Sequence, residues 1–149
     1  MGRDFRVFIL EDRTERMSKF QRALIGVPFD HAADAATAKE LLSSEKYDLI
    51  FLDHDLGGDE FVSSDDPNTG YQVAKFIPET PNALTPAVIH SCNPGGAQNM
   101  QGVLPHAVIV PFPSLDVVKM VDMAKEIDEF VAGSGEEPPE RGVDRDVPL

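Results

Sequence analysis

Short apolar runs alternate with amphipathic stretches along most of the chain. Each apolar run is rich in β-branched and aromatic residues, which is typical of strands buried on both faces of a parallel sheet. The pattern therefore predicts a regular alternation of strands and helices. The expected strands cover residues 6–12, 27–34, 46–53, 84–93 and 106–112.

The stretches between these strands predict the helices. Residues 14–25 repeat apolar side chains at helical spacing, and the alanine-rich residues 35–45 follow Asp34, a good N-terminal cap. A third helix is expected over residues 69–76, stopping before Pro78. The first helix carries an apolar stripe of Met17, Phe20 and Leu24, and its other face is basic, with Arg13, Arg16, Lys19 and Arg22.

The last two helical segments differ in strength. Residues 94–104 are expected to form at most a short, weak helix, because their glycines lower helix propensity. The final helix is firmer, since Ser114 can cap it and one apolar stripe continues along it. That stripe consists of Val117, Val121, Ala124, Ile127 and Val131.

Five strands alternating with five helical segments predict an open parallel sheet with helices on both faces, because right-handed crossovers place helices there. The expected strand order is 2-1-3-4-5, the flavodoxin-like arrangement. At 149 residues and 42% hydrophobic content, the chain suits one domain, expected over residues 1–132. Residues 133–149 combine three prolines with alternating charge and predict a disordered, acidic Pro/Gly tail.

Composition narrows the range of partners. With 26 acidic and 13 basic residues, the net charge of −13 repels a phosphate backbone, so no nucleic-acid duplex is expected as a partner. No apolar window is long enough for a membrane span, and no membrane association is expected. The single cysteine, Cys92, cannot form an internal disulfide, and no export signal is visible, which favours the cytoplasm.

Polar side chains follow three of the predicted strands. In open parallel sheets, ligands bind outside the carboxyl ends of the strands, where the strand order reverses. Strands one, three and four are neighbours under the expected order, so their end residues meet in one crevice. These residues are Glu11 and Asp12, then Asp53, His54 and Asp55, and finally His90, Ser91, Cys92 and Asn93.

Clustered carboxylates raise one another's pKa unless a cation neutralises them. A hard divalent ion such as Mg²⁺ or Mn²⁺ meets that need, with waters and a phosphate completing its shell. Asp53 and Asp55 are therefore interpreted as members of a metal site that presents a phosphoryl group. A helix-loop-helix calcium site fits poorly, because its twelfth position is Ser64 instead of a bidentate glutamate.

Several of these residues also have structural interpretations. The side chain of His54 would point to the opposite face of a continuing strand from that of Asp53. Cys92 resembles the small buried cysteines of many cores, and Asn93 before Pro94 is a common start of a turn. These alternatives stay open at the level of sequence.

Residues 5–131 resemble the receiver domains of two-component signalling. Glu11 and Asp12 stand where receivers carry metal-binding acids, and Asp53 stands where they carry the phospho-accepting aspartate. Asp55 matches the position whose main-chain carbonyl completes the metal shell in receivers. Ser91 matches the position at the end of strand four where receivers carry a Ser or Thr hydroxyl. The resemblance implies the receiver fold and its metal-dependent phosphate chemistry.

The fifth strand departs from the receiver pattern. Receivers place a lysine directly before a proline there, whereas this chain has Val110 before Pro111. The stretches LDHDLGG, NTGYQVAKF and VIHSCNPGGAQNM resemble an atypical branch, the cyclic-phosphate processing receiver-like domains. That resemblance implies a prokaryotic receiver scaffold that binds or hydrolyses a cyclic phosphate or nucleotide.

The favoured hypothesis is metal-dependent handling of a phosphate ester, with a cyclic-phosphate phosphoesterase as its enzymatic form. Asp12 and Asp53 would hold the metal and Glu11 would bind it directly or through water. His90 and His54 would serve as proton donors or metal ligands. Contacts to the phosphate are assigned to Ser91 and Asn93.

Two other hypotheses remain from sequence. In the first, Asp53 accepts a phosphoryl group from a histidine kinase or a small phosphodonor, and the last helix and fifth strand recruit another signalling protein. In the second, the chain is an interaction module that works without phosphorylation.

Overall fold

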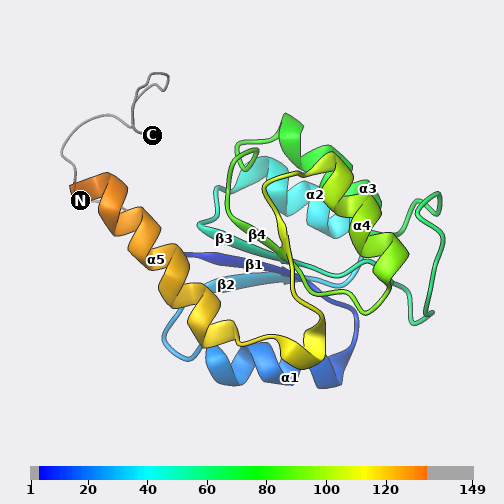
Figure 1. Cartoon of the computed structure of the whole chain (residues 1–149), viewed down its shortest axis with the longest axis horizontal. Coiled ribbons are helices and arrows are strands. Elements are labelled where there is room, and N and C mark those ends of the chain that lie inside the picture. The colour runs from blue at the N-terminus through cyan, green and yellow to red at the C-terminus, as the bar shows by residue number, and fades with distance from the viewer. Residues whose placement is uncertain (1–3, 134–149) are drawn as a thin grey trace.

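The computed structural model describes residues 4–133, with side chains through Ile127. It contains a five-stranded parallel sheet in the order β2-β1-β3-β4-β5, with helices on both faces (Figure 1). The predicted α/β fold and strand order are therefore confirmed. The strands are β1 (Val7–Leu10), β2 (Phe29–Ala32), β3 (Leu49–Leu52), β4 (Ala87–Ile89) and β5 (Val108–Ile109).

The helices form a layer on each side of the sheet. One layer contains α1 and α5, and the other contains α2, α3 and α4 (Figure 1). Two single turns of 3₁₀-helix cover Ile77–Glu79 and Phe112–Ser114. The α-helices are α1 (Thr14–Ala23), α2 (Ala35–Ser44), α3 (Gly70–Phe76), α4 (Pro94–Val103) and α5 (Val117–Gly133).

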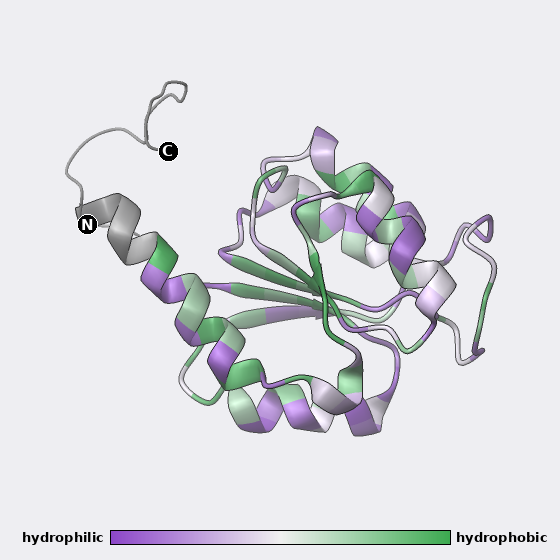
Figure 2. Cartoon of the chain, viewed as in Figure 1, coloured by the Kyte–Doolittle hydropathy of each residue, from purple (hydrophilic) through white to green (hydrophobic). Residues whose placement is uncertain are grey.

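Successive side chains of the central strands point to opposite faces of the sheet, so the core consists of two layers, one on each face. Phe8 and Leu10 of β1 pack with the α2, α3 and α4 layer, whereas Val7 and Ile9 pack with the α1 and α5 layer. The central strands β1, β3 and β4 are accordingly strongly hydrophobic, whereas the edge strand β2 is partly hydrophilic (Figure 2). Burying each such side chain contributes roughly 1.5–3 kcal/mol, so the central strands are held firmly and their carboxyl ends are well placed.

Helix α4 is as long as α1 and α2 despite its glycines, so the expectation of at most a short helix was wrong, and its expected weakness stays a prediction. It runs for ten residues. The Oδ1 atom of Asn93 accepts a hydrogen bond from the main-chain N–H of Gly96, and Pro94 occupies the first turn, where its missing N–H costs nothing. Ala97 and Met100 are buried against the core. Capping and packing therefore outweigh low helix propensity.

Helix α5 differs from expectation at both ends. Ser114 belongs to the preceding 3₁₀ turn, and Asp116 caps the helix by accepting a hydrogen bond from the main-chain N–H of Lys119. Ile127 is 56% exposed, because α5 extends beyond the sheet that buries its first half (Figure 1). Val131 lies outside the described side chains, and residues 134–149 of the predicted tail lie outside the described residues.

Among the described residues, no helix has the length and apolar character needed to cross a membrane.

Glycine at position 70 brings α3 against the end of β3. The main-chain N–H of Gly70 donates to the carbonyl of His54, and a Cβ at position 70 would overlap the carbonyl oxygen of Asp53. Because backbone atoms cannot yield as flexible side chains do, only glycine fits here. The start of α3 is thus built around the main chain of the candidate site.

We predict that Gly70→Ala lowers the free energy of unfolding by on the order of 3 kcal/mol, because the strand end must shift. Gly102→Ala is the matched control, since an added Cβ there meets no atom within 4 Å. It should raise stability by about 0.5–1 kcal/mol through helix propensity. Urea denaturation of both variants checks this, and equal stability of Gly70→Ala and the wild type would contradict the close approach.

Candidate metal and phosphate site

Strand register explains which polar side chains meet. Leu10, Leu52 and Ile89 are the last paired residues of β1, β3 and β4, and they lie on one rung of the sheet. Residues on the same rung of parallel strands point to the same face, and the next rung points to the opposite face. The next rung faces the α1 and α5 layer. It consists of Glu11, Asp53 and His90.

These three side chains form a buried cluster. Glu11 and His90 are fully buried and Asp53 is 2% exposed. One ligand atom from each lies within 4.8 Å of the others. The Nε2–H of His90 donates to Oε1 of Glu11 at 2.8 Å, while the His90 ring packs against Phe20 with ring centroids 5.3 Å apart. The cluster therefore combines close ionisable groups with an apolar wall.

Burial and charge act differently on the two carboxyl groups. Burial alone would raise the pKa of Glu11, but the hydrogen bond and charge of His90, the main-chain N–H of Arg13 and the charge of Arg16 together lower it. Burial raises the pKa of Asp53 to about 6, and the nearby Glu11 adds to this against the opposing charge of His90. Glu11 is thus an anion at neutral pH, and Asp53 is an anion that a cation would stabilise strongly.

The cluster fits a divalent metal. Two carboxylates offer the oxygen ligands that Mg²⁺ and Mn²⁺ prefer, and an imidazole nitrogen lies beside them. Two further atoms, Oδ1 of Asp12 and Nδ1 of His90, are buried and have no hydrogen-bond partner among the described residues. Asp12 lies next to Glu11 in the chain, and its unpaired oxygen is a candidate additional ligand.

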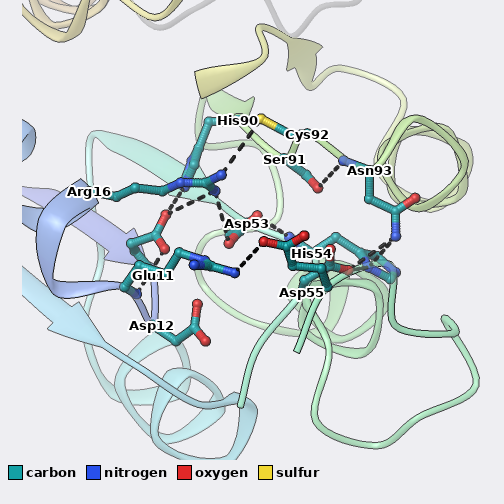
Figure 3. A network of polar contacts seen from close by, with 12 residues as sticks. Glu11, Asp12, Arg16, Asp53, His54, Asp55, His90, Ser91, Cys92 and Asn93 are labelled. Carbon is teal, nitrogen blue, oxygen red and sulfur yellow. Dashed lines mark hydrogen bonds and ion pairs between the residues drawn. The ribbon is translucent and has the colours of Figure 1, made fainter. Parts of the chain in front are cut away.

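Arg16 supplies a cation to the cluster from α1 (Figure 3). Its Nη1 lies 3.7 Å from Oδ2 of Asp53 and 3.9 Å from Oε1 of Glu11, and its guanidinium lies 5.0 Å from the centre of the Phe112 ring. Close charge-assisted hydrogen bonds are shorter, about 2.7–2.9 Å. The guanidinium therefore lies near both carboxylates but makes a close hydrogen bond to neither.

Arg16 was missed from sequence, where it was grouped with the solvent-facing basic side of α1. The available signal was its spacing from Phe20: residues four apart lie on the same side of a helix, and Phe20 is fully buried beside His90. Val110 leaves β5 without the lysine that receivers carry, and Arg16 brings positive charge to Asp53 from a different element.

A small cavity of about 80 Å³ opens beside Asp53. It lies between the end of β3, the start of α1 and the loop that follows β3. Its wall contains both charges and apolar surface. The lining residues are Arg13, Arg16, Asp53, Asp55, Glu60, Phe61 and Cys92.

His54 lies on the other face of the sheet from Asp53, as the pleat requires. Its ring is fully buried against α4, where a Cβ on Gly96 would overlap it. The Nδ1–H donates to Oδ1 of Asp55, and Nε2 is 2.9 Å from the hydroxyl of Ser64, which also accepts a hydrogen bond from Asn99. Both ring nitrogens are thus engaged in tying the loop after β3 to α4.

The Asp55 carboxylate is the main anchor of that loop. Its oxygens accept hydrogen bonds from His54, from the side-chain amide of Asn93 and from the main-chain N–H groups of Phe61 and Val62. Burial would raise the pKa of Asp55, but these hydrogen bonds lower it overall. A contribution of Asp55 to a metal would therefore come from its main-chain carbonyl, as the receiver resemblance implies.

The remaining predicted residues lie around the cavity instead of in its wall. Asp12 is half-buried, and its Oδ2 accepts a hydrogen bond from the main-chain N–H of Gly58. The hydroxyl of Ser91 accepts from the main-chain N–H of Asn93, and the Asn93 amide caps α4 and binds Asp55. Direct phosphate contacts of Ser91 and Asn93 stay a prediction.

The sheet order and the acidic strand ends at its switch point define a receiver domain. The phosphorylated cyanobacterial phytochrome response regulator RcpA is similar to it, with a TM-score of 0.58 and 20% identity over 91% of this chain and 99% of that one. The signal receiver domain of an HD domain-containing protein from Pseudomonas fluorescens Pf-5 has a TM-score of 0.67 and 13% identity, covering 91% and 96% of the two chains.

A third similar structure is the receiver domain of the sensor histidine kinase PA1611 from Pseudomonas aeruginosa PAO1, which has a magnesium ion coordinated in its active-site cleft. Its TM-score is 0.62 at 17% identity, over 83% of this chain and 97% of that one. At these identities the three likenesses show the fold. No curated protein matches the chain.

The family assignment comes from sequence. The model of the cyclic-phosphate processing receiver domain matches residues 8–106. The chain belongs to this family, and the resemblance drawn from its motifs is confirmed.

We predict that Asp53→Asn stabilises the metal-free protein at pH 7.5. The pKa of Asp53, about 6, lies above the usual value near 4 of an unfolded chain, so the folded state takes up the proton more readily. Stability is therefore lost as the pH rises from 4 to 6, and the loss is complete above pH 6. Replacing the charge should recover on the order of 2 kcal/mol at pH 7.5 and little at pH 4.

Thermal unfolding in EDTA across this pH range measures the difference between the two proteins. In a parallel series, Mg²⁺ should stabilise the wild type at pH 7.5 but leave Asp53→Asn nearly unchanged. A stability difference that does not vary with pH would refute the raised pKa of Asp53.

Proposed function

We propose that this chain binds Mg²⁺ or Mn²⁺ through Glu11, Asp12 and Asp53 and uses the site to hydrolyse a cyclic phosphate ester. The observation that carries the proposal is the buried rung of Glu11, Asp53 and His90, whose ligand atoms converge beside Arg16 and an open cavity. Membership of the cyclic-phosphate processing receiver family supports a cyclic phosphate as the substrate.

The overall reaction opens the phosphate ring. A new bond forms between a water oxygen and phosphorus, one of the two ring P–O bonds breaks, and the leaving oxygen takes up a proton, which yields a phosphate monoester. A divalent ion at this site would lower the pKa of the attacking water and withdraw charge from the phosphoryl oxygens. Glu11 and Asp53 would hold that ion, and Asp12 would complete the protein ligands with its unpaired oxygen.

Arg16 is our candidate for the phosphate contact. It lines the cavity, and its ion pairs with Asp53 and Glu11 are long enough for the guanidinium to turn to another anion. Binding of a cation at the two carboxylates would release Arg16 from them. A guanidinium then offers paired donors to phosphoryl oxygens, which suits it to the place that the missing lysine leaves.

His90 acts through Glu11 in this proposal. Its side chain is fully buried and does not line the cavity, and its Nε2–H is directed at Glu11. The hydrogen bond keeps Glu11 ionised and oriented toward Asp53. His54 and Asn93 support the site from the α4 side, where their polar atoms fix the loop that forms the far wall, and Ser91 accepts a hydrogen bond from the main-chain N–H of Asn93.

The first test is chromatography of reactions containing the protein, Mg²⁺ or Mn²⁺, and a panel of 2′,3′- and 3′,5′-cyclic nucleotides. We expect metal-dependent ring opening by the wild type. In Asp53→Asn we expect the rate of ring opening to fall at least a hundredfold, because a carboxylate ligand of the metal is lost. Mass spectrometry after exposure to acetyl phosphate runs in parallel. A stable phosphoryl adduct on Asp53 without any turnover would favour the receiver-signalling hypothesis, with a histidine kinase as partner, and would reject the hydrolase.

A second prediction separates positioning from proton transfer at His90. His90→Gln keeps an N–H group that can donate to Glu11, whereas His90→Ala leaves that carboxylate without it. We expect His90→Gln to keep metal affinity and most of kcat, and His90→Ala to lose at least tenfold in both. Calorimetric metal titration and turnover are measured on each variant. Normal metal affinity with abolished turnover in His90→Gln would instead make His90 the general acid.

A further inference from the structure

Phe61 is a large aromatic side chain left exposed at the candidate site. Its side chain is 68% exposed, and it is the one aromatic residue among the exposed large hydrophobic residues of the described chain. It also lines the cavity beside Asp53 and Arg16. The ring is therefore an apolar surface on the wall of a cavity whose other lining side chains are mostly charged.

The backbone holds Phe61 in an unfavourable conformation. Its φ angle is +55°, and it is the one residue other than glycine with positive φ in the described chain. This region is unfavourable for a bulky side chain and persists only where neighbouring contacts impose it. Here the carboxylate of Asp55 accepts hydrogen bonds from the main-chain N–H groups of Phe61 at 2.7 Å and Val62 at 3.1 Å.

Two further contacts fix the part of the loop that precedes Phe61. The Arg13 guanidinium lies 2.8 Å from the carboxylate of Glu60, the residue before Phe61. The main-chain N–H of Gly58 donates to Asp12 at 2.7 Å. Asp12, a candidate metal ligand, and Asp55, which lines the cavity, therefore both hold this loop, which couples the position of the ring to the site.

The size of the cavity determines what Phe61 can meet. At about 30 Å³ per water, a volume of about 80 Å³ has room for roughly three waters, which is enough for a phosphoryl group but too little for a nucleoside as well. The organic part of a phosphate ester bound at Asp53 and Arg16 must extend past the cavity wall. Phe61 is the aromatic surface available there.

We propose that Phe61 stacks on the base of the substrate, so that the chain acts on cyclic nucleotides in preference to cyclic phosphates without a base. This inference rests on the proposed function and specifies its substrate class. Aromatic stacking accepts any base because each has a planar π-face. We therefore expect selection for the presence of a base and little discrimination among bases.

A fluorescence measurement tests the binding without turnover. The chain contains no tryptophan, so Phe61→Trp introduces a single indole at the proposed stacking position. With Mg²⁺ present, AMP should quench its emission, and inorganic phosphate at the same concentration should not. Equal responses to AMP and phosphate, or no response to either, would overturn the stacking assignment.

Kinetics test the same inference through substrate choice. Phe61→Ala should lower kcat/KM for 2′,3′-cyclic AMP at least tenfold and leave that for ribose 2,3-cyclic phosphate unchanged. Phe61→Tyr should keep the wild-type preference. Phe61→Asn accepts positive φ but lacks a ring, so it should behave as Phe61→Ala and separate stacking from backbone strain. Leu84→Ala removes an 87% exposed side chain outside the cavity and should leave kcat/KM for both substrates unchanged.

The outcomes distinguish the two proposals. If the wild type opens both substrates equally and Phe61→Ala matches it, the phosphoesterase stands and the role of Phe61 is rejected. If the preference for a base persists in Phe61→Ala, stacking on Phe61 is also rejected, and the base lies instead in the neighbouring apolar groove lined by Pro94, Ile109 and Pro111. If neither substrate is opened, the proposed function fails, and AMP-specific quenching alone decides whether Phe61 binds a base.

Discussion

The hydrogen bond between His90 and Glu11 joins two fully buried side chains that would be costly to bury alone. It depends on the register of β1, β3 and β4, which places both residues and Asp53 on one rung beyond the last apolar one. Burial leaves Asp53 with a raised pKa beside an ionised Glu11. The sheet therefore places two carboxylates close together where water solvates them poorly, and a bound cation would stabilise their negative charges.

Because successive residues after β3 point to opposite faces of the sheet, Asp53 and His54 have different surroundings. Asp53 turns toward α1, where Arg16 brings a positive charge, and His54 turns toward α4, where it binds Asp55 and Ser64. The first face forms the candidate metal site, and the second fixes the loop that forms the outer wall of the cavity. In the proposed function, a receiver fold that lacks the lysine of β5 would still place protein charge beside a phosphoryl group.

Much of this arrangement could be predicted because it depends on periodicity. The apolar runs indicated the strands, and the expected 2-1-3-4-5 order of those strands brought the ends that carry Glu11, Asp53 and His90 together. The capping of α4 by Asn93 and its packing were missed, since glycine content reports helix propensity and not tertiary contacts. Arg16 and Phe61 were also missed, because their positions depend on a helix orientation and on a loop held by Asp55, and local sequence specifies neither.

The most direct test of a metal and phosphate site on this rung is a crystal structure with Mn²⁺ and inorganic phosphate, using anomalous scattering to locate the metal. We predict an anomalous peak bonded to carboxylate oxygens of Asp53 and Glu11 or Asp12, with phosphate beside it and the Arg16 guanidinium turned onto the phosphate. A peak confined to surface acids, with Arg16 still paired to Asp53 and Glu11, would contradict the account.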